Sequence, residues 1–375
     1  MMSSITISDA PVFLPKAKGA TATPSIEDTV LPVPPFDPAI HLNLQPPVAR
    51  HSFTELGLPV PKGCPDVCYT DPFQLFSEEG IRMIRREVFQ RPFLDKYVRS
   101  WDRAPCVITG HSVHENVGTF LKQAWGHPIT RAAVNFAFGS ELKLQGGDND
   151  MGYINVQLGP EGLAGVYKTT EEPALPLSEI DESRTSEFDS VPVDAWHKDQ
   201  TPVVLVLMLS DTSTMVGGET AIRTGTGDII KSRGAAIGGA VIMAGGYLEH
   251  AALRAENCTE RLSMVNSYTY EDPNADDSAT TLKGIHIHND SYANAMNNIM
   301  AQKLARLRDR CDSAITVIQR RCKNGEMPDR EEVEDWVKDQ IYMLKHTAWE
   351  MFERIPNYVG EEIPEDALKR YLSDV

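Results

Sequence analysis

Between residues 105 and 270 the apolar residues come in short runs, each bounded by glycine, proline or polar residues. Helical patterns of about 10–15 residues do not alternate with these runs, which argues against a βαβ fold. Many short strands with Gly-rich turns are typical of a β-sandwich or barrel. We therefore expect a mainly β core, with strands in five runs: Ala132–Phe138, Gly152–Leu158, Val203–Leu209, Ala240–Met243 and Leu262–Tyr270.

Helical patterns flank this core. Ser77 precedes Glu78, Glu79 and an apolar face, which predicts a capped helix within 77–97. After Asp290 the apolar period becomes three and four residues, which predicts one long amphipathic helix, and Pro328 opens another. We expect both to pack on the outside of the core through apolar faces: Met296, Met300, Leu304, Leu307, Cys311, Ile315 and Ile318 on the first, and Val333, Trp336, Val337, Ile341 and Leu344 on the second.

Three segments follow from these patterns. Residues 1–72 are a Pro-rich extended N-terminal arm, because runs such as Leu31–Pro38 disfavour helix. Residues 73–288 are the β core with its N-terminal helix, and 168–192 is a polar, acidic loop that we expect to act as a lid. Residues 289–375 are a C-terminal helical extension packed on the core.

Charge and composition exclude several classes of partner. The chain of 375 residues carries 36 Lys and Arg against 53 Asp and Glu, a formal charge of −17. Such a surface repels phosphate backbones and anionic lipids, so we expect no nucleic acid and no membrane partner. The first twenty residues lack the basic and apolar regions of a signal peptide, and six cysteines follow no zinc-site spacing. These observations predict a cytoplasmic protein with reduced thiols.

The segment Trp196-His197-Lys198-Asp199 precedes an apolar strand. Residues i and i+2 of an extended chain project from the same face, so His197 and Asp199 point together. His250 ends a second segment of β character. Two imidazoles and one carboxylate can occupy one face of an iron(II) octahedron. A His-x-Asp pair with a purely structural role remains an alternative.

Arg261 lies eleven residues after His250, and Ser263 follows on the same strand face. Arginine presents a planar fork of donors that matches a carboxylate. An arginine facing into a barrel carries an uncompensated charge until an anion arrives, and the distal carboxylate of 2-oxoglutarate would supply one. A salt bridge to an Asp or Glu is the alternative.

Further polar residues are substrate-binding candidates. Tyr153, Asn155 and Gln157 alternate with apolar residues, so one face of their strand is polar. That face either points into the barrel, where it would bind cofactor or substrate, or lies in water. Arg223 is either a second anion clamp or a surface charge.

The order His197-x-Asp199, Gly217-Gly-Glu-Thr220, His250, Arg261-x-Ser263 resembles the iron(II)/2-oxoglutarate-dependent oxygenases. Residues 203–262 resemble in particular a fungal branch that serves secondary metabolism and includes amino-acid oxygenases that form aziridines.

The resemblance implies a double-stranded β-helix, a jelly-roll, cupin-like barrel with flanking helices and a metal at one open end. His197, Asp199 and His250 would ligate Fe(II), and no other catalytic residue is implied. Arg261, Ser263 and Thr220 would hold 2-oxoglutarate. The cosubstrate would be O2, with ascorbate as a useful additive in vitro.

The implied function is oxidation of a small molecule by hydrogen abstraction, leading to hydroxylation, desaturation or cyclisation such as aziridine formation. An amino acid or amino-acid-derived metabolite is the expected substrate, and a monomer or homodimer the expected state. The alternatives are a larger terpenoid or polyketide substrate, a cupin dioxygenase that needs no 2-oxoglutarate, or a non-catalytic metal-binding jelly roll. We expect Trp349 and Phe352, as exposed aromatics, to wall the opening opposite the lid.

Overall fold

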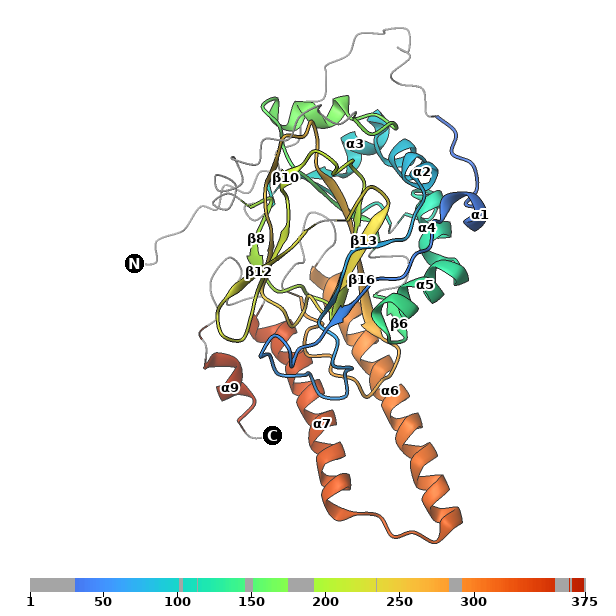
Figure 1. The fold of residues 1–375 in the computed structure, drawn as a ribbon. Helices are drawn as coiled ribbons and strands as arrows, with labels where there is room; N and C mark the ends of the chain where they lie inside the picture. The colour runs from blue at the N-terminus through green and yellow to red at the C-terminus, as the bar shows by residue number, and fades with distance from the viewer. Residues whose placement is uncertain are drawn as a thin grey trace.

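Two antiparallel sheets form the centre of the molecule (Figure 1). The computed structural model describes residues 31–100, 104–112, 114–145, 151–174, 192–233, 235–282, 292–354, 364 and 366–373. The larger sheet has ten strands. Eight run in the order β1 (Arg50–His51), β2 (Tyr69–Thr70), β13 (Gly239–Met243), β9 (Val203–Met208), β16 (Leu262–Tyr270), β7 (Tyr153–Val156), β5 (Val107–Ile108) and β4 (Val98–Arg99), while β3 (Phe73–Gln74) pairs with β13 and β6 (Leu142–Leu144) with β16.

The smaller sheet has four strands, and a two-stranded pair accompanies it. Its order is β12 (Ile229–Ser232), β11 (Thr220–Arg223), β14 (His250–Ala252) and β8 (Asp194–His197), and the pair is β10 (Val216–Gly217) with β15 (Ala255–Glu256). From β8 onward the chain alternates between the large sheet (β9, β13, β16) and the smaller strands. The core is thus mainly antiparallel β-structure, as the sequence predicts.

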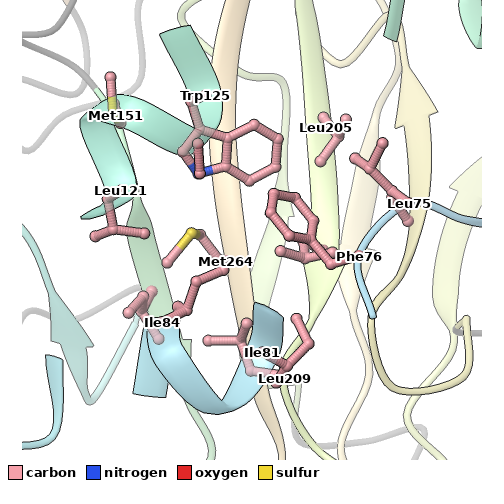
Figure 2. Close-up of a cluster of buried hydrophobic side chains, with 14 of the residues drawn as sticks. Leu75, Phe76, Ile81, Ile84, Leu121, Trp125, Met151, Leu205, Leu209 and Met264 are labelled. Atoms are coloured by element: carbon pink, nitrogen blue, oxygen red, sulfur yellow. The ribbon is translucent and has the colours of Figure 1, made fainter. Parts of the chain in front are cut away.

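The large sheet is covered on both faces. Successive side chains of a strand point to opposite faces, and in β16 Leu262 and Met264 pack under the helices in the larger apolar core, where Figure 2 shows Met264 near Ile84. Val265 packs on the other side, in a second cluster that includes Ile222 from the smaller sheet. The space between the sheets is therefore partly filled by apolar side chains.

Four helices cover the outer face of the large sheet: α2 (Glu78–Val88), α3 (Arg91–Tyr97), α4 (Thr119–Gly126) and α5 (Pro128–Phe138). Ser77 caps α2 as predicted, because its hydroxyl accepts a hydrogen bond from the Gly80 amide at 3.0 Å. The shorter helical elements are α1 (Pro38–His41), η3 (Gly162–Lys168), η5 (Trp349–Arg354) and α9 (Ala367–Tyr371).

The strand predicted at Ala132–Phe138 is wrong, because these residues form the second half of α5. Pro128 stands at the start of this helix, where its missing N–H costs nothing, and Gly139 ends it with a left-handed φ of 81°. Val134, Ala137 and Phe138 are buried at helical spacing. The run is short and apolar because one helix face is buried, a case that composition alone does not separate from a strand.

The described part of the predicted N-terminal arm joins the sheet. Strands β1 and β2 pair with each other, and Tyr69 of β2 also pairs with Met243 of β13. The boundary at residue 72 stays a prediction. No helix in the described ranges is long and apolar enough to cross a membrane.

Two long C-terminal helices, α6 (Tyr292–Asn324) and α7 (Arg330–Ala348), confirm the predicted helix pair. The predicted apolar face of α6 holds only at its base, where Met296 packs on the buried cluster of Leu282, Ala295 and Ile299. The predicted core-facing side of α7 is wrong for Val333, Val337 and Ile341, which are exposed. The rest of the face predicted for α6 is wrong as well. Leu304, Ile315 and Ile318 are about half exposed, while the buried face carries Lys303 together with two arginines, Arg306 and Arg310. Only the base of this pair packs on the β core (Figure 1).

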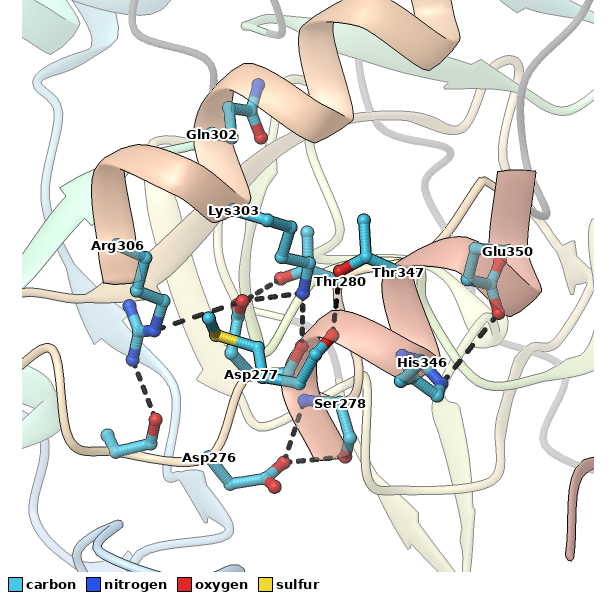
Figure 3. Close-up of polar contacts among 12 residues, drawn as sticks. Asp276, Asp277, Ser278, Thr280, Gln302, Lys303, Arg306, His346, Thr347 and Glu350 are labelled. Carbon is cyan, nitrogen blue, oxygen red and sulfur yellow. Dashed lines mark hydrogen bonds and ion pairs between the residues drawn. The ribbon is translucent and has the colours of Figure 1, made fainter. Parts of the chain in front are cut away.

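A buried polar cluster attaches α6 to the segment 272–282 (Figure 3). The Lys303 ammonium donates to the Asp277 carboxylate at 2.5 Å and to its carbonyl at 2.9 Å. Arg306 donates to the carbonyls of Asp272 and Ala275 at 3.0 and 2.7 Å. Burial alone would raise the pKa of Asp277, but the attraction of Lys303 and Arg306 outweighs it and lowers the pKa below its ordinary value.

Replacing Lys303 by Met should lower the free energy of unfolding by about 3 kcal/mol at neutral pH, measured by urea denaturation. The loss follows because the buried Asp277 carboxylate loses its hydrogen-bonded cation and keeps Arg306 at the longer distance of 3.8 Å. The difference from wild type should shrink as the pH falls below about 4, because the folded-state pKa of Asp277 is depressed and its contribution is lost on protonation.

The matched control is Arg330→Met in the neighbouring helix, which removes an exposed ion pair with Glu334. It should change the free energy of unfolding by less than about 0.5 kcal/mol. Equal losses in the two variants would contradict a structural role for the Lys303–Asp277 pair.

Candidate metal centre

His197, Asp199 and His250 come together at the open ends of two neighbouring strands. His197 ends β8 and lies opposite His250, the first residue of β14. The Nε2 atoms of His197 and His250 lie 3.4 Å from the two different carboxylate oxygens of Asp199. One ligand atom from each residue lies within 4.8 Å of the others, so the three can hold one metal ion.

Backbone carbonyls orient both imidazoles. Nδ1 of His197 lies 2.5 Å from the Ala195 carbonyl, and Nδ1 of His250 lies 3.0 Å from the Leu248 carbonyl. A carbonyl oxygen only accepts, so each Nδ1 carries the proton and each Nε2 keeps its lone pair for a metal. Burial lowers the pKa of His250, although Asp199 opposes this, so the neutral ligand form is favoured.

The turn after β13 fixes the position of Asp199. The sequence analysis did not identify this role of the turn. The Asp199 amide donates to the Gly245 carbonyl at 2.9 Å. A Cβ at Gly245 would lie only 1.9 Å from Asp199 Oδ2, and one at Gly246 would lie 2.4 Å from the Thr201 carbonyl. The Gly-Gly pair five residues before His250 was the available signal, since only glycine permits so close an approach.

Arg261 is a buried cation with unused donors. The residue is 3% exposed, and one terminal nitrogen donates to the Gly218 carbonyl at 3.2 Å. Among the described residues Nε and the other terminal nitrogen have no hydrogen-bond partner. Burial lowers its pKa to about 10, which still leaves it charged at neutral pH. A Cβ at Gly218 would lie 2.9 Å from the Ala255 Cβ and 3.4 Å from Arg261 Nε, so a glycine here lets the turn pack closely against β15 and the arginine.

Strand register places Ser263, Asn155 and Tyr153 on the face of Arg261. Ser263 pairs with Asn155, and Val265 pairs with Tyr153. Directly opposed residues share a face, and Val265 packs between the sheets. Asn155 is buried and its side-chain oxygen has no partner among the described residues. The polar face of β7 therefore points inward and not into water.

Other predicted residues lie in different surroundings. Thr220 pairs with Ala252 two positions from the Ile222–His250 pair, so it shares the inner face. The amide of Gln157 instead makes two hydrogen bonds with the backbone of Ala255, at 2.7 and 2.8 Å, and so clamps β15.

Arg223 points to the outer face of the smaller sheet. It pairs with Glu249 at 2.8 Å and lies 4.7 Å over the ring of Trp196. Arg223 therefore lies on the opposite face of the sheet from the inward-facing residues.

Arg85 of α2 is a supporting residue that the sequence did not single out. It is fully buried, pairs with Glu260 at 2.5 Å and donates to the Leu209 carbonyl at 3.0 Å. It also donates to the Thr170 carbonyl at 3.1 Å, so one guanidinium ties the start of the predicted lid loop to the residue before Arg261. The signal was an arginine on the apolar face of an amphipathic helix.

Two other predictions concern the walls of the site. Residues 175–191 of the predicted lid 168–192 lie outside the described residues. Trp349 was expected to be exposed, which is wrong: it is buried and packs against Tyr371 with ring centroids 5.5 Å apart. Phe352 is exposed as expected.

Comparison with known proteins gives distant structural matches alone. No protein-family model matches the chain, and no curated protein matches it. A Pseudomonas putida prolyl-4-hydroxylase is 13% identical, with 52% of this chain and 88% of that chain covered and a TM-score of 0.29. SnoN, a non-haem α-ketoglutarate-dependent epimerase from nogalamycin biosynthesis, is 13% identical, with 51% and 73% covered and a TM-score of 0.31.

The match to IDO from Bacillus thuringiensis is 21% identical, covers 21% of this chain and 36% of that chain, and has a TM-score of 0.18. The matched part thus spans about a third of that protein.

Replacing Gly245 by Ala should weaken binding of Mn²⁺ by at least about tenfold, because the new methyl group displaces the Asp199 carboxylate. Isothermal titration of the metal-free protein measures the affinity. Gly159→Ala is the control, since nothing lies within 4 Å of its Cβ position. Unchanged Mn²⁺ affinity in Gly245→Ala would show that Asp199 is not a ligand.

Proposed function

We propose that the chain is an iron(II)/2-oxoglutarate-dependent oxygenase. The observation that carries the proposal is the combination, on the inner faces of the two sheets, of a His-Asp-His cluster and a buried arginine with unused donors. A metal cluster alone would suit many proteins. A buried guanidinium without a carboxylate partner favours a site built to receive an anion.

The alternation of the chain between the two sheets supports a double-stranded β-helix. In that arrangement β8, β11 and β14 form one wall and β9, β13 and β16 the other, with the metal cluster at one end. Ile222 of the first wall and Val204 of the second belong to one buried apolar cluster, and Ile222 pairs with His250 across β11 and β14. The same topology would suit a cupin dioxygenase that needs no 2-oxoglutarate.

Different residues would bind the metal and 2-oxoglutarate. His197, Asp199 and His250 would hold Fe(II) on one face, a donor set of two imidazoles and one carboxylate that suits this metal. Arg261 would take the distal carboxylate of 2-oxoglutarate through its unused donors, with Ser263 beside it and Thr220 on the facing strand. Bound iron and 2-oxoglutarate together supply the activation of O2 for hydrogen abstraction.

The substrate is proposed to be an amino acid or amino-acid-derived metabolite, oxidised by hydroxylation, desaturation or cyclisation. Support comes from Asn155, whose buried oxygen is available to an ammonium or amide donor, and from Tyr153 on the same face. The motif resemblance to a fungal secondary-metabolism branch points the same way. A cytoplasmic location is proposed from the six cysteines, all of which are free thiols.

Replacing Arg261 by Lys should weaken 2-oxoglutarate binding by more than about tenfold, equivalent to roughly 1.4 kcal/mol. Lysine keeps the charge but loses the planar fork that matches a carboxylate. Anaerobic titration of the Fe(II)-loaded protein, followed by the visible charge-transfer band of the chelated keto acid, measures the affinity.

The control is Arg308→Lys on the exposed surface of α6, which should bind 2-oxoglutarate like wild type. Equal affinities in Arg261→Lys and wild type would move the keto-acid site elsewhere. A wild-type protein that binds Fe(II) but never develops the band would refute the 2-oxoglutarate assignment and favour a cupin or a non-catalytic metal protein.

Incubating the iron-loaded protein with 2-oxoglutarate, O2 and each standard amino acid should show succinate formation stimulated by at least one of them. A product heavier by one oxygen atom indicates hydroxylation, and one lighter by two hydrogen atoms indicates desaturation or cyclisation. Mass spectrometry of both products measures the outcome. If no amino acid stimulates succinate formation, the amino-acid proposal fails and the larger terpenoid or polyketide class becomes the substrate to test.

A further inference from the structure

Beyond the β core, α6 and α7 continue as a two-helix hairpin (Figure 1). None of residues 311–339, all of which the structure describes, is buried. The two helices are joined near the tip by an ion pair between Arg321 and Glu332 at 2.6 Å, and nearer the base by a hydrogen bond from Arg310 to Gln340 at 3.3 Å. These polar contacts define the faces that the helices turn toward each other.

Several apolar residues of the hairpin directly follow the residues that make these polar contacts. Cys311 follows Arg310, and Val333 and Ile341 follow Glu332 and Gln340. One residue turns a helix by about 100°. The two helices are antiparallel and face each other. A step of one residue from the contact residues therefore directs the side chains of both helices to the same side of the hairpin.

The hairpin therefore carries an apolar face made from both helices. Its members on α6 are Leu304, Cys311, Ile315 and Ile318, and its members on α7 are Val333, Val337 and Ile341. The six apart from Cys311 are between 43% and 53% exposed. Most helical stability comes from the packing of an apolar face, and a continuous exposed face of this kind marks an interaction site.

The size of this face suits a weak two-fold interface. From Leu304 to Ile318 it extends about 21 Å at 1.5 Å per residue, and two helices of about 10 Å width give roughly 400 Å² per copy. Two copies would bury about 800 Å², an area typical of weak association that depends on protein concentration.

Charge also favours a second copy. Residues 303–345 carry ten Lys and Arg and nine Asp and Glu, a net charge of +1, whereas the whole chain carries −17. The hairpin is thus a part of the surface where two copies can meet without bringing their net negative charge together.

We propose that this face binds the same face of a second copy of the chain, so that two hairpins form a four-helix bundle and the protein is a homodimer. The proposal depends on the hairpin alone and requires neither iron nor 2-oxoglutarate.

The test is the double variant Ile315→Glu/Ile318→Glu, measured beside wild type by sedimentation velocity from micromolar to hundred-micromolar concentration. Wild type should sediment as a dimer and the double variant as a monomer, with dimer dissociation constants that differ by at least about a hundredfold. Both side chains are exposed within one chain, so the variant should keep its fold, which circular dichroism checks.

The matched control is Ile229→Glu on β12, because Ile229 and Ile315 are both 50% exposed. It should remain a dimer. A monomeric wild type, a dimeric double variant or a control that also dissociates would each overturn the proposal.

Hydrogen exchange supplies a second readout. Amides of residues 311–341 should exchange more slowly in wild type at high concentration than in the double variant. Equal exchange in the two proteins would overturn the proposal, as would protection that arises only when a different protein is added.

Discussion

The central strand β16 is the element on which the rest of the structure depends. It hydrogen-bonds to β9 on one side and to β7 on the other. Because its side chains alternate, one strand sends Leu262 and Met264 into the core under the helices and Ser263 into the space between the sheets. A slip of one residue would exchange these faces, so the apolar core that fixes the register also places Arg261 and Ser263.

A second constraint is the close approach of two loops around Asp199. The strand before this residue belongs to the smaller sheet, and the turn at Gly245 ends a strand of the larger one. The contact between the Asp199 carboxylate and the Gly245 Cα leaves no room for a side chain. The metal cluster thus depends on the spacing between the two sheets, and the buried apolar cluster that contains Ile222 and Val204 helps to fix that spacing.

Much of this arrangement could be predicted from the sequence, because the signals are local. Strands near 153–156, 203–208 and 262–270 follow from apolar runs between turns, and the α2 cap follows from Ser77. His197, Asp199 and His250 lie together as the motif spacing indicates. The direction of Arg223 could not be predicted, because it depends on which face of β11 meets the large sheet.

The buried face of α6 shows why hydrophobic periodicity can mislead. Segment 272–282 lies outside every strand, so the carbonyl oxygens of residues such as Asp272 and Ala275 need donors that no neighbouring strand supplies. Arg306 donates to both. These bonds compensate the burial of the cation, and they turn the charged side of α6 toward the core. The apolar residues Leu304, Ile315 and Ile318 of the helix are consequently directed outward.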